Sequence, residues 1–319
     1  MTAAPDTAPG PPGTGPTGGA PERSRNRPVR VMTRTDVVAV TIMVAVPTLL
    51  VLVLVWVPAL ATVALSFTSW NGIGSLGSIR VVGDANYVNV ATNYPPFWPA
   101  LRHNLIWLGA LFAVATPLGM FLAVLLDKEM RFSRFYQTAI YLPVVLSLAL
   151  VGFIWQLIYS RDQGLLNAVL GTKVDWYGDP RYNLWAALVA ASWKHVGYIM
   201  LLYLAGLKAV DPALREAARI DGASERQTFF GVVFPVMRPI NVIVLVITVI
   251  EALRAFDLVW VINKGRNGLE TIATLVTQNV VGEASRIGFG SAMATIMLVI
   301  SSVFVVLYLT IMIREERQR

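Results

Sequence analysis

Long apolar stretches alternate with short polar connections along most of the chain. Six stretches reach the ~20 residues that a helix needs to cross a bilayer, so the sequence predicts an all-α, polytopic membrane protein with six transmembrane helices. The first stretch, 37–79, contains no charged residue, and its apolar part ends near Phe67, which predicts one long helix. The other five stretches lie at 104–126, 136–160, 182–207, 239–262 and 287–313.

The composition agrees with membrane insertion and excludes several kinds of site. Hydrophobic residues make up 55% of the chain and charged residues only 14%, whereas a soluble domain carries about a quarter charged residues. The mean hydropathy is +0.61. The absence of cysteine and the presence of only two histidines, His103 and His195, exclude disulfides, thiolate metal sites and multi-histidine metal sites. We expect His103 at the membrane interface.

The basic residues are distributed unevenly between the two sets of connections. The tails and loops on one side carry sixteen Lys and Arg, and those on the other side carry eight. The positive-inside rule therefore predicts a multi-pass protein of the cell membrane with both termini in the cytoplasm. The net charge of +7 is accounted for by these loops and does not indicate nucleic-acid binding.

The first 28 residues contain seven prolines and five glycines. This composition predicts a disordered cytoplasmic tail over 1–35, followed by a transmembrane domain over 36–313 and a short cytoplasmic tail over 314–319. The tail is not expected to be a cleavable signal peptide, because the apolar stretch after it is too long.

The connection 208–238 contains start and stop signals for two short helices. Asp211 followed by Pro212 is a typical helix start, with the carboxylate as cap and proline in the first turn. Gly222 ends this helix, and Ser224 can cap a second one. The predicted product is a cytoplasmic helix–turn–helix, whose second helix we expect to end at the proline that follows its aromatic residues.

A spaced motif runs through the same connection. It reads Glu-Ala-Ala at 216–218, three residues, Gly222, nine residues, and then Val-Val-Phe-Pro ending at Pro235. This pattern resembles the EAA loop of ABC importer permeases, with the spacing fully kept. The resemblance implies contacts with an ATPase subunit through Glu216, Ala217, Ala218, Asp221, Gly222 and Pro235.

The resemblance extends beyond this loop. The segments Pro-Val-Val-Leu-Ser at 143–147, Gly-Phe-Ile-Trp at 152–155 and Gly-Leu-Leu-Asn at 164–167 are similar to those of carbohydrate-uptake permeases of the maltose and glycerol-phosphate first-permease type. Many members of that group have Gly-Gly-Pro after the fifth span, where this chain has Lys-Gly-Arg-Asn-Gly at 264–268.

The family resemblance implies partner subunits. The chain has no Gly-x-x-x-x-Gly-Lys-Ser/Thr motif to hold nucleotide phosphates, so ATP and Mg would bind to two separate ATP-binding subunits, and this chain would be no enzyme and hold no cofactor. The resemblance also implies a second homologous permease, an extracellular solute-binding protein that delivers a sugar, and the lipid bilayer around the pore.

Charged residues inside the predicted spans need a polar environment. Lys194 and Glu251 each lie roughly 18 Å from one end of their spans, and a charge near mid-membrane costs about 2.5–3.5 kcal/mol. One interpretation is a structural ion pair, between Lys194 and Glu251 or between Glu251 and Arg254. The other is a substrate cavity, with aromatic rings for stacking on sugars. The candidate residues of that cavity are Trp193, Lys194, His195, Tyr198 and Glu251.

Other functions stay open at this point. The solute could be a related polyol or glycerol-phosphate. An ion-gradient-driven secondary carrier would explain Lys194 and Glu251 as an ion relay, although it would not explain the motif at 216–235. An intramembrane enzyme has no support, because no nucleophile and base occur together.

Overall fold

The structure is a computed structural model that describes residues 33–73, 75, 77, 79–128, 131–282 and 285–317. Within these residues helices dominate and no strand occurs beyond one isolated bridge between Thr68 and Val81, which confirms the all-α prediction. The tail predicted to be disordered lies, except for its last three residues, outside the described part. The chain divides into two units, Met1–Val55 and Trp56–Arg319.

The described part of the first unit is a single apolar helix. Helix α1 (Arg34–Val51) begins with a capping box, in which Thr33 and Asp36 each accept a hydrogen bond from the backbone N–H of the other. A π-helical segment, Leu52–Trp56, connects it to α2 (Val57–Leu65). None of the residues of α1 is buried. The prediction of one long first span is confirmed over Arg34–Leu65.

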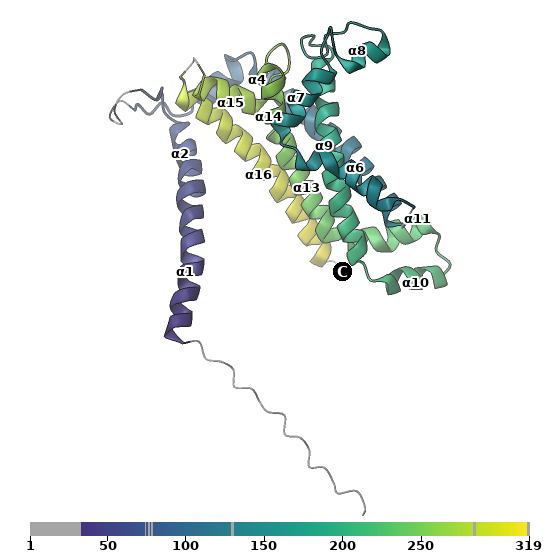
Figure 1. Cartoon of the computed structure of the whole chain (residues 1–319). Coiled ribbons are helices and arrows are strands. Elements are labelled where there is room, and N and C mark those ends of the chain that lie inside the picture. The colour runs from purple at the N-terminus through teal and green to yellow at the C-terminus, as the bar shows by residue number, and fades with distance from the viewer. Residues whose placement is uncertain are drawn as a thin grey trace, which may run out of the picture. The chain divides into compact units, whose positions relative to one another are not determined.

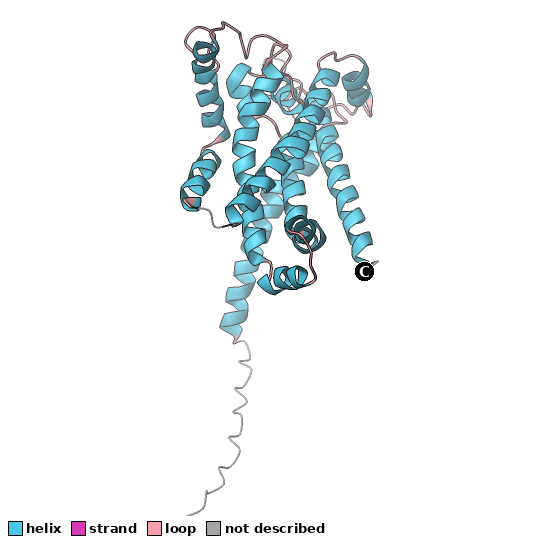
Figure 2. Ribbon diagram, turned by 90° about the vertical axis from the view of Figure 1, so that its right-hand side faces the viewer, coloured by secondary structure: helices cyan, strands magenta, loops and turns pink. Residues whose placement is uncertain are grey.

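The second unit is a helical bundle (Figure 1 and Figure 2). After α2 its elements are α3 (Ala85–Thr92), α4 (Phe97–Ala110), a π segment (Leu111–Ala115), α5 (Thr116–Asp127), α6 (Ser133–Val145), α7 (Leu148–Ile158), α8 (Leu165–Leu170), α9 (Asn183–Ala209), α10 (Pro212–Ile220), α11 (Glu225–Thr228), a π segment (Phe229–Val233), α12 (Phe234–Val236), α13 (Arg238–Leu253), α14 (Asp257–Asn263), α15 (Ile272–Val280) and α16 (Ile287–Arg317).

The connections of this unit gather at its two ends. Helices α10 and α11 and the C-terminal end of α16 lie at one end, and α8 and α15 lie at the other (Figure 1). An ion pair joins the α5–α6 connection to α11 through Lys128 and Glu225, and at the opposite end Asn183 donates a hydrogen bond to the carbonyl of Asn267. The loops thus form the same two groups that the charge count compares.

Only some of the six predicted spans are single helices. In the described residues, four helices are long and apolar enough to cross a membrane: Arg34–Leu65, Phe97–Asp127, Asn183–Ala209 and Ile287–Thr310. A fifth is reached if α6 and α7, which meet at an angle of 102°, are counted as one span. The prediction of continuous helices in the third and fifth stretches is wrong.

The bend in the third stretch has a local cause. Pro143 lies near the end of α6, where its ring disfavours regular helical hydrogen bonding. Leu146 and Ser147 then adopt extended backbone angles, and the Ser147 hydroxyl accepts from the N–H of Leu150 to start α7. A proline followed by a serine cap therefore divides one apolar stretch into two helices.

The fifth stretch is interrupted between α13 and α14, and two buried side chains satisfy the carbonyls freed there. The Asn104 amide donates to the carbonyls of Ala252 at 3.0 Å and Leu253 at 3.2 Å. The Thr271 hydroxyl donates to the carbonyl of Ala255 at 2.8 Å. Unsatisfied carbonyls cannot be tolerated in an apolar surrounding, so these contacts stabilise the break.

Proline also follows each π segment of the described chain. Pro58, Pro117 and Pro235 each occupy the first turn of the helix that comes directly after one of the π segments. Proline has no N–H, and its ring collides with the carbonyl four residues before it in a regular α-helix. The wider π register accommodates the proline ring.

The expectation that the second short helix ends at Pro235 is wrong, because the helix continues to Val236.

Helices α5 and α9 approach closely at Gly119. A Cβ atom on this residue would lie 2.8 Å from Cβ of Ile199 and 2.9 Å from the carbonyl oxygen of Val196. These distances are shorter than ordinary contacts, and one neighbour is backbone that cannot move aside. The two helices therefore form one closely packed pair.

We expect Asn104→Leu to destabilise the bundle, because it leaves buried carbonyls without donors at about 1–3 kcal/mol for each group. The change is measured as the thermal unfolding midpoint of the purified chain in detergent. Asn93→Leu is the matched control, since Asn93 is exposed and its amide bonds only to the side chain of Asn89. Equal midpoints for the two variants would contradict the bridging role of Asn104.

Candidate functional site

A cavity of about 210 Å³ lies where α9 passes the break between α13 and α14. Helix α9 contributes Lys194, His195 and Tyr198, and Glu251 comes from α13. Four of the five residues predicted for a cavity thus line the same space. Trp193 does not line it; its ring packs edge-on against Trp155 at 5.8 Å. Arg254 and Asp257, which flank the helix break, complete the charged lining.

The intramembrane charges do not form the ion pairs that the sequence suggests. The Lys194 ammonium donates to the carbonyl of Leu146, at the bend between α6 and α7. Arg254 pairs with Asp257, with 3.7 Å between nitrogen and oxygen, and Glu251 is in none of the ion pairs described. The lysine therefore satisfies a freed backbone carbonyl, and the Glu251 carboxylate remains at the cavity without a direct cationic partner among the described residues.

The orientation of His195 is determined by a buried threonine. The Thr248 hydroxyl donates to the carbonyl of Val244 at 2.7 Å and lies 3.2 Å from Nε2 of His195. A hydroxyl has one proton, so while that of Thr248 is donated to Val244, its oxygen accepts from Nε2 of His195. The Thr116 hydroxyl lies 3.4 Å from the Thr248 hydroxyl. Neither threonine is recognisable from the sequence, because both lie in uninterrupted apolar runs.

His103, which we expect at the membrane interface, is buried within the protein, and its Nδ1 donates to the backbone carbonyl of Glu270 at 2.8 Å. Asn104, its neighbour, accepts from the N–H of Ile272. The two residues together attach the start of the second apolar stretch to the loop before α15, so His103 has a structural role.

The predicted start and stop of the first short helix are present. The Asp211 carboxylate accepts from the N–H of Ala213 at 2.9 Å. At the other end, Gly222 has a φ of +81°, and its N–H bonds to the carbonyl of Arg219 while that of Ala223 bonds to Ala218. This pair of bonds is a Schellman motif, whose left-handed position favours glycine.

The second short helix begins as predicted and is anchored by apolar contacts. Ser224 and Gln227 form a capping box. Val233 is buried in the cluster that contains Leu126 of α5 and Met237. Helix α10, in contrast, buries only Ala218. Glu216, Ala217, Asp221 and Gly222 are exposed and Pro235 is half-buried.

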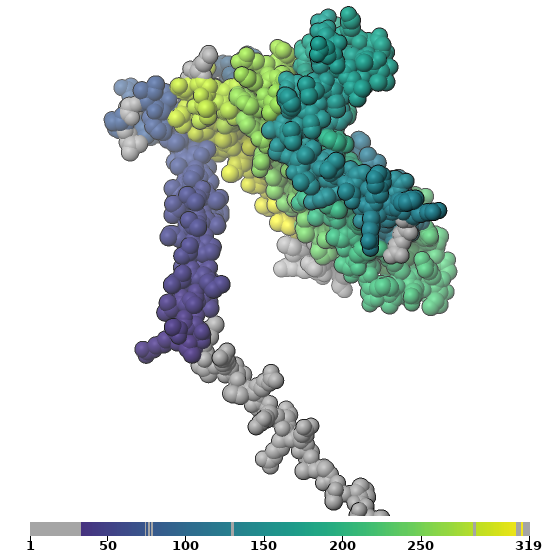
Figure 3. Space-filling model, viewed as in Figure 1, coloured from purple at the N-terminus to yellow at the C-terminus, as the bar shows by residue number. Residues whose placement is uncertain are grey.

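The 208–238 loop forms one end of the surface of this unit, shown in green at the lower right of Figure 3. An ion pair of 2.7 Å joins Glu225 of this loop to Lys128. The hydrogen bond and positive charge from Lys128 hold the pKa of the Glu225 carboxyl below its usual value. The loop thus presents exposed small and charged side chains on a helix whose ends are fixed by caps.

The comparisons with known proteins agree on one family. Residues 115–317 match the model for the binding-protein-dependent transport system inner membrane component. A probable ABC transporter permease protein of Pyrococcus horikoshii is 33% identical over 77% of this chain and 85% of its own length. The xylose/arabinose import permease protein XacH of Haloferax volcanii is also 33% identical, over 75% of this chain and 76% of its own.

The fold has a counterpart among solved structures. It is similar to a chain in the crystal structure of a bacterial ABC transporter involved in the import of the acidic polysaccharide alginate, with a TM-score of 0.73. The match covers 88% of this chain and 96% of that chain at 20% sequence identity.

We expect Lys194→Met to lower the thermal unfolding midpoint in detergent, because the Leu146 carbonyl loses its donor. Glu251→Gln should change the midpoint little, since it breaks no described ion pair. The double variant Lys194→Met/Glu251→Gln should equal the sum of the single effects within about 0.5 kcal/mol. Recovery of stability in the double variant would instead indicate a direct ion pair between the two side chains.

Proposed function

This chain belongs to the binding-protein-dependent transport system inner membrane component family, and we propose that it is the permease subunit of an ATP-driven importer of sugars. The observation that carries the proposal is the 208–238 loop. Its exposed helix α10 ends in a glycine turn at the position where the EAA motif has its glycine. The family match includes this loop and four of the predicted apolar stretches.

The loop would connect transport to ATP hydrolysis in another subunit. Helix α10 exposes Glu216 and Ala217, so a partner can approach the helix backbone closely and form one charged contact. Gly222 sets the turn that directs the second helix back toward α5. Asp221 and Pro235 lie at the ends of this contact region. ATP and Mg would be held by a pair of separate ATP-binding subunits.

The proposed membrane arrangement has six crossings. The bent pair α6–α7 would be the third, and α13 with α14 would form the fifth as a broken span, whose free carbonyls are satisfied by Asn104 and Thr271. The transmembrane domain would extend over 36–313. The sixteen basic residues in one group of tails and loops support cytoplasmic termini, with the loops at the α8 end outside.

The remaining partners follow from the half-pore that a single chain provides. A second homologous permease would complete the translocation pathway, and an extracellular solute-binding protein would deliver the solute at the α8 end. The apolar face of α1, with no buried residue, would lie against lipid or the second permease.

The cavity between α9 and the α13–α14 break is the proposed solute pathway. Its lining contains two cationic side chains, Lys194 and Arg254, and two anionic ones, Glu251 and Asp257. This balance favours an uncharged, hydroxyl-rich solute such as a sugar or polyol over glycerol-phosphate. The xylose/arabinose permease among its relatives supports a sugar.

An ion-gradient-driven carrier is the alternative from another class. It would use Lys194 and Glu251 as a relay, but the Lys194 ammonium is engaged with the Leu146 carbonyl. It also gives no role to the exposed, capped helix α10. We therefore favour the ATP-driven importer.

Gly222→Val tests the loop's role. Gly222 has open space around it, so the cost comes from its backbone angle, about 1–2 kcal/mol for a side chain with a Cβ. We expect normal membrane insertion with a severe loss of ATP-driven uptake. The assay is solute uptake into proteoliposomes that contain the complete transporter, together with capture of the ATPase by the tagged permease.

Gly222→Asn is the matched control, because asparagine tolerates left-handed angles better than valine, and it should keep most of the uptake. Near-normal uptake by Gly222→Val with the ATPase bound would contradict the coupling role of this loop. Uptake that proceeds without any ATPase would favour the carrier.

The proposed topology predicts that reporters fused after Arg319 and inserted beside Ser224 both read as cytoplasmic, since both lie in the basic group of connections. A reporter at Lys173, in the connection between α8 and α9, should read as external. Phosphatase and fluorescent-protein fusions measure the two sides. An external signal at Ser224 would overturn the orientation and the ATPase contact together.

A further inference from the structure

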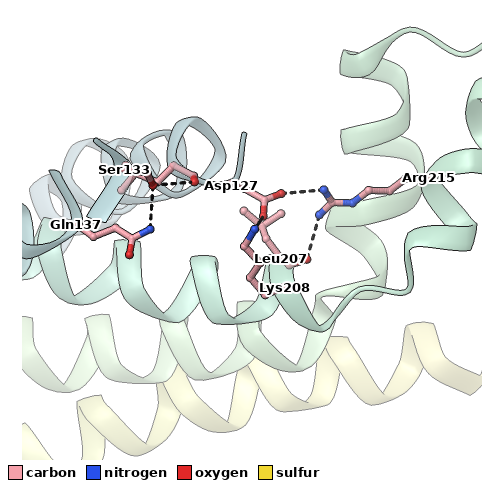
Figure 4. A network of polar contacts seen from close by, with 7 residues as sticks. Asp127, Ser133, Gln137, Leu207, Lys208 and Arg215 are labelled. Atoms are coloured by element: carbon pink, nitrogen blue, oxygen red, sulfur yellow. Dashed lines mark hydrogen bonds and ion pairs between the residues drawn. The ribbon is translucent and has the colours of Figure 1, made fainter. Parts of the chain in front are cut away.

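One carboxylate joins three helices at the end of the bundle that bears the 208–238 loop. Asp127 is the last residue of α5, and its side chain is only 11% exposed. It pairs with Arg215 of α10 at 2.8 Å and with Lys208 of α9 at 3.1 Å. Arg215 also donates to the carbonyl of Leu207, at 3.0 Å, so its guanidinium lies between the ends of α5 and α9 (Figure 4).

The position of Asp127 is unfavourable without these cations. An acidic residue in the last turn of a helix lies at the negative end of the helix dipole. Arg215 has the opposite relation, because its positive charge lies beside a carbonyl at the C-terminal end of α9. The network therefore depends on the attraction between Asp127 and the two basic side chains. This attraction offsets the unfavourable interaction of the Asp127 charge with the dipole of α5, an interaction that an uncharged residue would not have.

Among the described residues, α10 has few other attachments to the membrane helices. Its one buried residue is Ala218, whereas Val233 of the following segment lies in the apolar cluster with Leu126. A second ion pair joins Lys128, which follows α5, to Glu225 of the 208–238 loop. Both side chains are exposed to solvent, that of Lys128 to 54% and that of Glu225 to 76%. Exposed pairs of this kind contribute little, and Glu225 belongs to α11. Among the described residues, the Asp127–Arg215 pair is the ion pair that joins α10 itself to α5.

We propose that Asp127 is a positioning residue that fixes the angle of α10 relative to the α5–α9 pair, so that force applied to α10 moves both membrane helices together. This inference rests on the proposed function, in which an ATPase contacts α10. In this inference Asp127 determines how efficiently ATP hydrolysis is coupled to transport, and the exposed face of α10 binds the ATPase.

The test uses the complete transporter in proteoliposomes and measures ATP hydrolysed per solute imported. Asp127→Asn keeps the side-chain shape and removes the charge. We expect it to bind the ATPase at the wild-type level and to raise the ATP-to-solute ratio about fivefold or more, the lower range of allosteric coupling effects. Arg215→Gln should act in the same way, and the double variant should be no worse than either single one, because both lose one shared interaction. Asp127→Glu should restore most of the coupling.

Glu225→Gln is the matched control, because it removes the exposed ion pair between the same two loops, and its ratio should stay at the wild-type value. A second readout is independent of transport. The chain contains no cysteine, so spin labels at Ala139→Cys in α6 and Ala213→Cys in α10 report one distance in the assembled complex. We expect a narrow distance distribution that broadens with Asp127→Asn and not with Glu225→Gln.

An unchanged ATP-to-solute ratio in Asp127→Asn and Arg215→Gln, with an unchanged distance distribution, would overturn the positioning role. Failure of the proposed function appears differently, as an ATPase that does not bind the unaltered chain or as normal uptake by Gly222→Val. Should Asp127→Asn lower the yield of folded protein, Arg215→Gln decides the outcome, because its side chain is 30% exposed.

Discussion

Each break in an apolar helix frees carbonyl groups that need a donor, and in the described residues this requirement explains the positions of Lys194, Asn104 and Thr271. The bend between α6 and α7 frees the carbonyl of Leu146, which Lys194 satisfies. The break after α13 is satisfied by Asn104 and Thr271. In a bilayer, irregular backbone is tolerated only where protein groups or a water-filled cavity satisfy it. The two breaks meet at the cavity, so the constraint also explains why the cavity is polar.

The break after α13 places charged residues at the cavity. Arg254 directly follows α13 and Asp257 is the first residue of α14, while Glu251 lies about one helical turn before Arg254. At a spacing of three residues, Glu251, Arg254 and Asp257 would share one face even of a continuous helix. In the interrupted stretch all three line the same space.

Features encoded within a few residues could be predicted from the sequence. The caps at Asp211 and Ser224 and the stop at Gly222 each depend on neighbours at most four positions away, and all three were predicted. The spans that are regular helices were also predicted, because hydropathy alone identifies them. The continuation of the second short helix through Pro235 was missed, because Pro235 lies in the first turn of the helix that follows a π segment and does not end the helix.

Features that depend on distant partners could not be predicted in this way. Asn104 bonds to the N–H of Ile272, 168 positions away, and nothing in the sequence around Asn104 indicates that partner. The interrupted fifth stretch is apolar from Val242 to Ile250 except for Thr248, so its pattern is that of an intact helix. The hydrogen bond from buried His103 to the Glu270 carbonyl likewise joins residues far apart in the sequence, which a local pattern does not reveal.

The packing of the bundle suggests how a displacement of the loop could reach the cavity. Helices α5 and α9 contact each other at backbone distance around Gly119 and Ile199, and close-packed interfaces transmit displacement instead of absorbing it. Asp127 lies at the end of this pair, and Lys194 lies on the same α9, in contact with the bend of the third stretch. A rigid pair held at one end by α10 and bonded to a helix break farther along would shift the cavity lining whenever the loop moves. For this to happen, the contact at Asp127 must deform less easily than the helix breaks. A paired, mostly buried carboxylate on a close-packed helix pair satisfies this requirement better than an exposed ion pair does.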